Sequence, residues 1–508
     1  MLTSPIHELA ERVSAIDAGH GEHGTAPLEV NDVVSAVAGT YEKLRYLVEY
    51  REEHTVRRAA IERILRRRLI IEGRQFDGSR FMRELVEGRY LAAHEATEHF
   101  AHEASATVAR FEELATYVGD AYRRTLLSLA ASEIEALVTP FQAGLDVSVI
   151  DAMYKTIRPN LMATGYSSRE IDTQLFCACR RALLGSDDES LAYALWLAYV
   201  PTWKADNINL RETATAVPGI LTAIKRDVAH HLQWIIVPRI KREAISFRIL
   251  RSYLLEHPHA NLTDERAMSD YARHFLDRVY EVESERIKES GIRAVAYLFV
   301  TKFIIALIAE APYEYFVLNG LNYVPLITNL VFHPTLLFTL TRGVGSFTDR
   351  NTETIIADLH RILYDGTARA IVARSSSGGL TAIFAFFYAL LIVGVFGGIV
   401  GILQALKFNI VGGALFLLFL SLAMFFAYRI RMRARRWVVI EERGVPALLT
   451  TVLVAPIVRV GRYLSRTFSS INVFVLLMDF IIETPLKMVL NFSHHFLIYL
   501  REKANEVY

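Results

Sequence analysis

The sequence predicts an all-α protein with a helical cytosolic N-terminal domain, an α-helical transmembrane domain of two hairpins, and an amphipathic C-terminal helical tail. Long apolar runs are almost confined to residues 292–500, whereas residues 1–290 are charged and helical in pattern. Four of these runs reach about 20 residues, the length that crosses a bilayer as a helix. No stretch shows the apolar–polar alternation and hairpin turns that are typical of half-buried strands.

Composition excludes several classes of protein. The 508 residues are 52% hydrophobic and 22% charged, with a formal net charge of +1. This balance argues against a disordered chain and against a nucleic-acid binder that works through overall positive charge. The two cysteines, Cys177 and Cys179, are too few for a disulfide scaffold or a cysteine-rich metal module. We expect both to be buried thiols and not a redox pair.

Breaks in the sequence define six regions. Residues 1–28 begin with no signal-like apolar core and read as a flexible lead-in, after which Asn31 caps the first helix of a cytosolic domain over 29–290. Gly119, Pro140 and the turn at 257–264 separate helices within that domain, and Asp187 lies at a helix start. The remaining regions are a first hairpin (291–345), a cytoplasmic amphipathic helix (346–378), a second hairpin (379–430) and a basic linker with amphipathic membrane-associated helices (431–508).

The distribution of arginine and lysine predicts the orientation of the four spans. The spans are residues 293–311, 322–341, 380–403 and 409–428. Arginines flank the ends that point away from the turns, whereas the turns themselves carry only Lys407. The positive-inside rule therefore places both termini in the cytoplasm and both hairpin turns outside, and we expect a bacterial inner (cytoplasmic) membrane.

Ionisable residues inside the apolar segments are the main functional candidates, because an intramembrane charge is costly unless it is paired or hydrated. They are Lys302, Glu310, Asp479 and Glu483. Lys302 and Glu310 are expected on one face of the first span, and Asp479 or Glu483 is a possible partner for the lysine. The alternative, which we favour slightly, is that Lys302 extends to the cytoplasmic interface and forms a structural ion pair.

Two further patterns concern helix packing and the membrane surface. Small residues at small-xxx-small spacing let two helices approach closely, within one subunit or between copies: Gly394, Gly397, Gly398 and Gly401. Basic residues that suit a membrane surface follow the fourth span: Arg431, Arg433, Arg435, Arg436, Arg459, Arg462 and Arg466. The segments 445–468 and 474–501 are amphipathic, so they either lie in the headgroup plane or form further spans with a polar face turned to protein.

Evidence for catalysis is weak. His94, Glu98 and His102 share a helix face and have the chemistry of metal ligands, but a surface helix rich in His and Glu explains them better. The six arginines within 57–68 suit anionic headgroups or RNA, although a solvated helix neutralised by neighbouring glutamates is favoured. No phosphate-binding loop, nucleophile elbow or zinc-protease helix occurs. We therefore expect no cofactor and regard enzymatic activity as the weaker hypothesis.

Four stretches together resemble a family of uncharacterised bacterial polytopic membrane proteins with a helical N-terminal domain. They are residues 41–69, 194–204, 301–314 and 478–490, with YEKLRYLVEYREEHTVRRAAIERILRRRL as the longest. The resemblance implies a bacterial inner-membrane location and implies no activity.

Two functions remain open at this point. The first is a structural, scaffold or assembly protein that acts through self-association and membrane-surface helices. The second is an oligomeric channel or transporter that uses Lys302, Glu310, Asp479 and Glu483. The expected partners are the lipid bilayer, further copies of the chain and cytosolic proteins, but not nucleic acid.

Overall fold

The computed structural model describes residues 2–18, 53–73, 76–92, 95–205, 207–320, 322–342, 347–366, 369–374, 378–440 and 445–470. The predicted cap at Asn31 and the segment with Asp479 and Glu483 lie outside these ranges. The described chain is mostly helical and divides into two compact units. The first unit comprises Met1–Val279 and Phe347–Ser376, and the second comprises Tyr280–Ser346 and Ser377–Tyr508.

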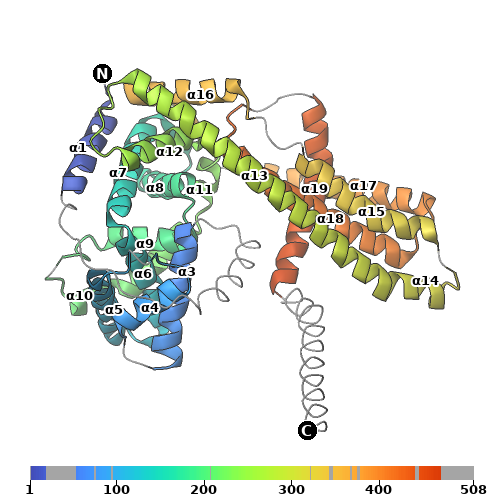
Figure 1. Cartoon of the computed structure of the whole chain (residues 1–508), viewed down its shortest axis with the longest axis horizontal. Coiled ribbons are helices and arrows are strands. Elements are labelled where there is room, and N and C mark those ends of the chain that lie inside the picture. Colours follow the sequence, from blue (N-terminus) through green and yellow to red (C-terminus); the bar gives the residue numbers. More distant parts are fainter. Residues whose placement is uncertain are drawn as a thin grey trace, which may run out of the picture. The chain divides into compact units, whose positions relative to one another are not determined.

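The first unit contains most of the predicted soluble helices (Figure 1). Its elements are α1 (Ser4–Ala18), α3 (Glu53–Arg66), the π-helical turn η1 (Arg67–Ile71), α4 (Gly78–Glu87), α5 (Glu98–Val118), α6 (Asp120–Val138), α7 (Pro140–Ile157), η3 (Arg158–Asn160), β1 (Leu161–Thr164), α8 (Ser168–Leu184), α9 (Asp188–Tyr199), α10 (Leu210–Val228), α11 (His231–Ile236), α12 (Lys241–Glu256), α16 (Asp349–His360), the π-helical turn η5 (Arg361–Asp365) and β2 (Ile371–Arg374). The helix starts at Asp187 and Pro140 and the break at Gly119 are confirmed, and the Asp187 side chain accepts a hydrogen bond from the Ser190 amide.

The flexible lead-in predicted for residues 1–28 does not hold for its first part. Residues 4–18 form α1, which packs against α7 and buries Ile6, Leu9 and Val13. These three side chains recur at three- and four-residue spacing, so they lie on one face of a helix. The Thr3 amide also donates to the Leu363 carbonyl at 2.9 Å, which ties this end of the chain to η5.

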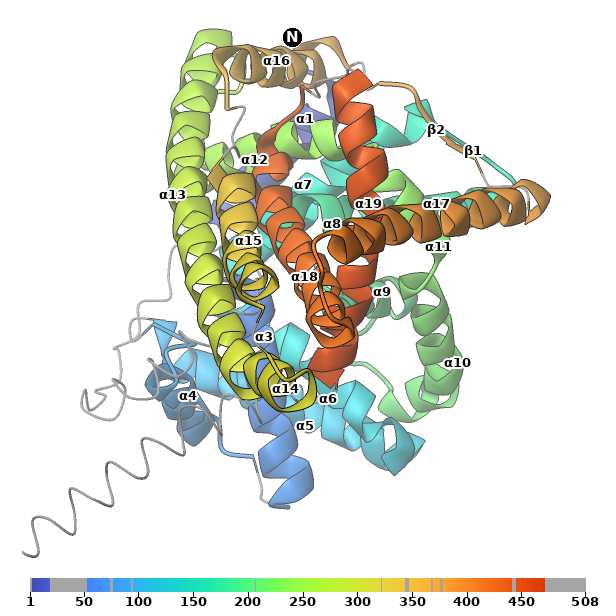
Figure 2. The same ribbon diagram turned by 90° about the vertical axis from the view of Figure 1, so that its right-hand side faces the viewer.

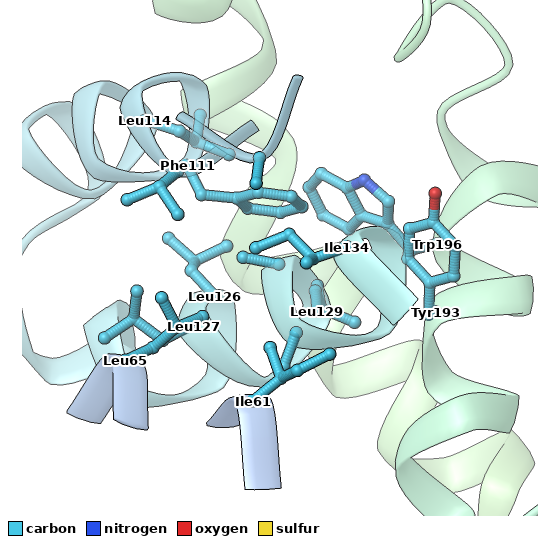
Figure 3. Close-up of a cluster of buried hydrophobic side chains, with 14 of the residues drawn as sticks. Ile61, Leu65, Phe111, Leu114, Leu126, Leu127, Leu129, Ile134, Tyr193 and Trp196 are labelled. Carbon is cyan, nitrogen blue, oxygen red and sulfur yellow. The ribbon is translucent and has the colours of Figure 1, made fainter. Parts of the chain in front are cut away.

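Aromatic and aliphatic side chains from α3, α5, α6 and α9 form the main core of the first unit (Figure 3). Trp203 is fully buried and lies next to Phe111 and Trp196, with ring centroids 4.6 and 5.2 Å away. Its indole Nε1 donates to the buried Glu133 carboxylate at 2.7 Å. The core is therefore anchored by a satisfied polar contact, which fixes how the chain after α9 returns to α6.

The arginines near residues 57–68 are largely paired within the protein. Arg58 lies 2.7 Å from Glu62 and 3.1 Å from Asp187, and Arg57 lies 3.0 Å from Glu135. Arg66 pairs with Glu62, and Arg67 and Arg68 both pair with Glu84. The arginines are neutralised as expected, but among these carboxylates only Glu62 lies on the same helix, and Arg58 is buried and not solvated.

A small parallel sheet links two distant parts of the first unit. β1 pairs with β2 in the register Leu161–Ile371 to Thr164–Arg374, and the two strands lie side by side in Figure 2. Helix α12 packs against α16 in the same unit. The segment predicted as a separate amphipathic helix is therefore built into the first unit, and the strands are an exception to the all-α prediction.

This arrangement constrains the path of the chain. Two candidate membrane helices separate Val279 from Phe347, and both flanking segments belong to the first unit. A chain that crosses a bilayer at each of these helices must return to the side from which it started. The first two apolar helices can therefore span a membrane only as a hairpin.

The second unit contains the apolar helices (Figure 1). Helix α13 (Glu265–Ile305) begins in the first unit and enters the second at Tyr280. The other elements of the second unit are the π-helical turn η4 (Ala306–Glu310), α14 (Ala311–Val317), α15 (Tyr323–Arg342), α17 (Gly378–Ala405), α18 (Ile410–Ala434), η6 (Arg435–Trp437) and α19 (Val445–Ser470). Four helices of the described chain are long and apolar enough to cross a membrane: Glu265–Val317, Tyr323–Thr341, Ile383–Ala405 and Ile410–Trp437. They coincide with the four predicted spans. Asn319 and Lys407, in the two predicted turns, both adopt positive φ.

Glu243 on α12 is a buried carboxylate in the first unit, and only 1% of its surface is exposed. Among the described residues, neither of its carboxylate oxygens has a hydrogen-bond partner, and burial raises its pKa above the ordinary value of 4.5. The nearby Asp358 instead attracts Arg242, Arg361 and Arg369, at 2.7, 3.0 and 3.3 Å. Burial therefore favours the neutral form of Glu243, whereas Asp358 is surrounded by arginines.

This burial predicts a pH-dependent stability. The folded-state pKa of Glu243 is raised, so the protonated side chain stabilises the fold relative to the ionised one. This stabilisation is fully present below pH 4.5 and is lost as the pH rises through the folded-state pKa. Glu243→Gln should therefore raise the free energy of unfolding at pH 7 by about 1 kcal/mol or more, and the gain should vanish near pH 4. Denaturant unfolding of the full chain in detergent at both pH values measures this. Equal gains or losses at both values would contradict it.

Candidate functional site

A cluster of polar side chains, most of them buried, lies among the apolar helices of the second unit. We call it the polar cluster, and its members are Lys302, Glu310, Glu314, Asn329, His333 and Asn409. Lys302 lies in the last turn of α13, Glu310 ends η4, and Asn329 comes from α15, which runs beside α18 in Figure 2. These three residues are exposed by only 4%, 2% and 1%.

The π-helical turn η4 aligns the two charged residues of the first apolar helix. In a regular α-helix, an eight-residue step from Lys302 to Glu310 would rotate the second side chain by about 80° around the axis. A π-helical turn inserts one additional residue, which reduces the rotation to about 20° in the other direction. Pro312, in the first turn of α14, follows directly. The sequence prediction that Lys302 and Glu310 share a face is confirmed through this turn, since both contact the same asparagine.

Asn329 joins the lysine to the glutamate. The Lys302 ammonium donates to the Asn329 carbonyl oxygen at 2.6 Å and also to the Asn329 Oδ1. The Asn329 amide nitrogen donates to Glu310 Oε1 at 2.7 Å and to the Gly412 carbonyl at 3.3 Å. The side-chain amide therefore turns its negative end to the lysine and its positive end to the carboxylate, which favours both charged forms.

Two further contacts extend the polar cluster. The ring nitrogens of His333 lie 3.2 Å from the Asn329 carbonyl oxygen and 3.0 Å from the Phe416 carbonyl oxygen. Beyond Glu310, the Glu314 carboxylate accepts a hydrogen bond from the Asn409 amide at 2.7 Å and one from the Asn322 backbone amide at 2.9 Å. The polar cluster thus connects α13, η4 and α14 to α15 and α18.

An aromatic ring and a glycine of α18 pack against the charged groups of the polar cluster. The Lys302 ammonium lies 4.9 Å from the centroid of the Phe419 ring, a cation–π geometry. A Cβ on Gly412 would lie 2.9 Å from Glu310 Oε1, so α18 approaches the carboxylate closely because residue 412 has no side chain. A groove on α15 is lined by other residues, among them Ile327, Val331 and Thr335. The arrangement suits a hydrogen-bonded contact between helices.

The other predicted candidates lie elsewhere in the described structure or outside the described residues. Asp479, Glu483 and His94 lie outside the described residues, and the exposed Glu98 and His102 lie on α5 in the first unit. Within the described ranges, no three His, Cys, Asp or Glu side chains converge as metal ligands would. Cys177 and Cys179 are free and buried as predicted, and burial raises the pKa of Cys177 to about 12.

The basic residues after the fourth span are exposed wherever their side chains are described. Arg431, Arg435 and Arg436 are exposed, whereas the side chains of Arg433 and Arg466 lie outside the described part. The Arg459 and Arg462 guanidinium groups lie 4.9 and 6.0 Å from the ring centroids of Tyr388 and Tyr428, on α17 and α18. The membrane-surface role of these arginines remains a prediction.

Sequence reasoning found Lys302 and Glu310 but missed the residues that join them. Asn329 and His333 are spaced four residues apart within an otherwise apolar span, so both fall on one helix face. An amide and an imidazole at this spacing were a usable signal, because uncharged polar side chains often form hydrogen bonds between membrane helices. Asn409 is the first residue of the predicted fourth span, and its contact with Glu314 depends on the hairpin packing.

No protein-family model, curated protein or solved structure matches this chain.

Proposed function

We propose that the chain is an integral protein of the bacterial inner membrane, with both termini in the cytoplasm, and that it acts as a self-associating scaffold. Its first unit would present a helical platform to cytosolic proteins, and its second unit would anchor that platform in the bilayer. The observation that carries the proposal is the position of the glycines on α17. No cofactor is invoked.

The glycines lie opposite the face of α17 that packs within the chain. Val395, Phe396 and Ile399 pack against the core formed with α18 and α19. At about 100° per residue, Gly394, Gly397, Gly398 and Gly401 fall on the far side of the helix. A Cβ built on any of these glycines would meet no atom within 4 Å in the described structure. The other explanation for this pattern is packing within one subunit. No described residue of the same chain packs against these glycines.

The same face continues towards the start of α17. Ile383, Phe387 and Leu390 are exposed, and together with Gly394, Gly397 and Gly401 they alternate steps of four and three residues. That is the spacing of a helix–helix seam, and small residues at such a seam let membrane helices approach closely. The most apolar stretch of α17 contains no buried residue. We therefore assign this seam to contact with a second copy of the chain.

Other observations support the membrane topology. The segments before the first span and between the second and third share one unit, as two hairpins require. Arginine-rich ends and nearly uncharged turns favour the cytoplasm for that unit. For α19, the contact of Gly461 with Ser421 in the apolar part of α18 favours a position within the helix bundle over one in the headgroup plane.

A glycine substitution tests self-association. Gly397→Ile should weaken the association of the full chain in lipid about tenfold or more, equivalent to about 1.4 kcal/mol, because the added side chain separates the seam. Gly413→Ile on α18 is the matched control, since a Cβ there also meets nothing within 4 Å. Single-molecule photobleaching in liposomes measures the change. A monomeric wild type, or equal effects of the two variants, would contradict the proposal.

An ion-conducting oligomer is the second candidate, and it is favoured by the burial of one lysine and two glutamates among candidate spans. In that case ion flux into liposomes should be present in the wild type and strongly reduced by Lys302→Met, but not by Lys407→Met in the turn. The scaffold proposal expects no flux from the wild type.

A further inference from the structure

Exposed apolar side chains of the first unit lie on the strand that precedes the third apolar helix, on its partner strand and on the helix packed against it. Met162 on β1 and Val372 on β2 are neighbours in the parallel register, and both are exposed, whereas Leu161 and Ile371 are buried. Helix α11 packs against β2 and exposes Trp234. We call Met162, Val372 and Trp234 the strand patch.

Basic groups accompany the strand patch. The Arg181 guanidinium lies 4.7 Å from the centroid of the Trp234 ring, and the exposed Arg239 follows α11. Tryptophan with an adjacent cation suits the boundary between headgroups and acyl chains, where one end of the side chain is apolar and the other is polar.

Chain length places the strand patch near the membrane in the proposed topology. β2 ends at Arg374 and α17 begins at Gly378, so at about 3.5 Å per residue the two ends are at most about 14 Å apart. The apolar part of α17 begins at Ile383, within its first two turns. The end of β2 is therefore separated by only a few residues along the chain from the helix that would enter the bilayer.

We propose that the strand patch docks on the cytoplasmic surface of the bilayer, with Met162, Val372 and Trp234 at the level of the headgroups and Arg239 near anionic phosphates. This inference rests on the proposed membrane insertion and adds a second contact between the first unit and lipid. Docking removes exposed apolar surface from water and restrains the first unit next to the bilayer.

Depth-dependent fluorescence quenching tests the inference. Full-length Met162→Cys and Val372→Cys carry an environment-sensitive dye in liposomes of anionic phospholipid, with and without nitroxide-labelled lipid. The native cysteines are buried and should not react. Ile71→Cys and Val147→Cys are controls, because both positions are exposed apolar sites of the first unit away from the strand patch. Leu390→Cys on α17 reports membrane insertion itself.

The inference expects lipid nitroxide to quench the labels at 162 and 372 at least about twofold more than those at 71 and 147, because interfacial side chains reach about 5–10 Å into the headgroup region. Quenching equal to the controls, with Leu390 strongly quenched, would overturn the docking and leave the membrane proposal intact. Iodide, a water-soluble quencher, provides a further comparison. Labels that neither iodide nor lipid nitroxide quenches would indicate that a second copy covers the strand patch, and this would also overturn the docking on lipid. An unquenched Leu390 label would contradict membrane insertion.

Discussion

Replacing Asn329 with leucine is expected to destabilise the second unit by about 3–5 kcal/mol. The substitution removes the amide that accepts from Lys302 and donates to Glu310, and both charged groups would remain buried without this link. An uncompensated buried charge costs far more than the hydrogen bond itself. Unfolding of the full chain by denaturant in lipid bicelles measures the loss.

Two comparisons make this result specific to the polar cluster. Thr335→Leu on the same helix should change the free energy of unfolding by less than about 0.5 kcal/mol, because its hydroxyl only donates to the Val331 carbonyl on an exposed face. Combining Asn329→Leu with Lys302→Met and Glu310→Leu should recover much of the loss, since no buried charge is then left unpaired at this position. Equal effects of Asn329→Leu and Thr335→Leu would refute the structural role of the polar cluster.

Gly461→Leu is expected to separate α19 from α18, at a cost of at least about 3 kcal/mol. A Cβ at residue 461 would overlap the Ser421 carbonyl oxygen, and that obstacle is backbone of the neighbouring helix, which cannot rotate away. The helices must therefore move apart and expose Ile457 and Val458, which are buried in their contact.

Protease sensitivity provides a direct measurement of this separation. Trypsin should cleave the Gly461→Leu variant in detergent after Arg459 or Arg462 faster than it cleaves the wild type. Gly413→Leu is the matched control, because a side chain at 413 enters open space. Unchanged cleavage and unfolding of the Gly461→Leu variant would show that α19 does not depend on this close approach.

The positions of the apolar helices follow from the sequence because their signal is local. A run of about 20 apolar residues must bury its backbone polar groups as a helix in a bilayer, whatever surrounds it. The breaks at Gly119 and Pro140 are equally local, since one residue disfavours continuation of the helix and the other suits its first turn.

Contacts between distant segments were not predictable in the same way. The pairing of residues 161–164 with 371–374 involves two four-residue strands more than 200 positions apart, and neither has a periodic pattern long enough to recognise. The partners of Arg57 and Arg58, Glu135 and Asp187, are likewise brought close only by the fold.

The polar cluster lies between these two cases. The charges of Lys302 and Glu310 are conspicuous in an apolar segment, but their alignment needs the π-helical turn η4, and their link needs Asn329 from another helix. A single polar residue in a span does not reveal which neighbour it faces.

The central claim is that the residues before the first span and those between the second and third form one unit on the cytoplasmic side. Single-cysteine labelling with a membrane-impermeant maleimide in intact spheroplasts and in inverted vesicles tests it most directly. Ile71→Cys and Ala357→Cys, both exposed in the first unit, should label only in inverted vesicles, and Asn319→Cys and Lys407→Cys only in spheroplasts. Labelling of position 357 from the side opposite to position 71 would contradict the two-hairpin account.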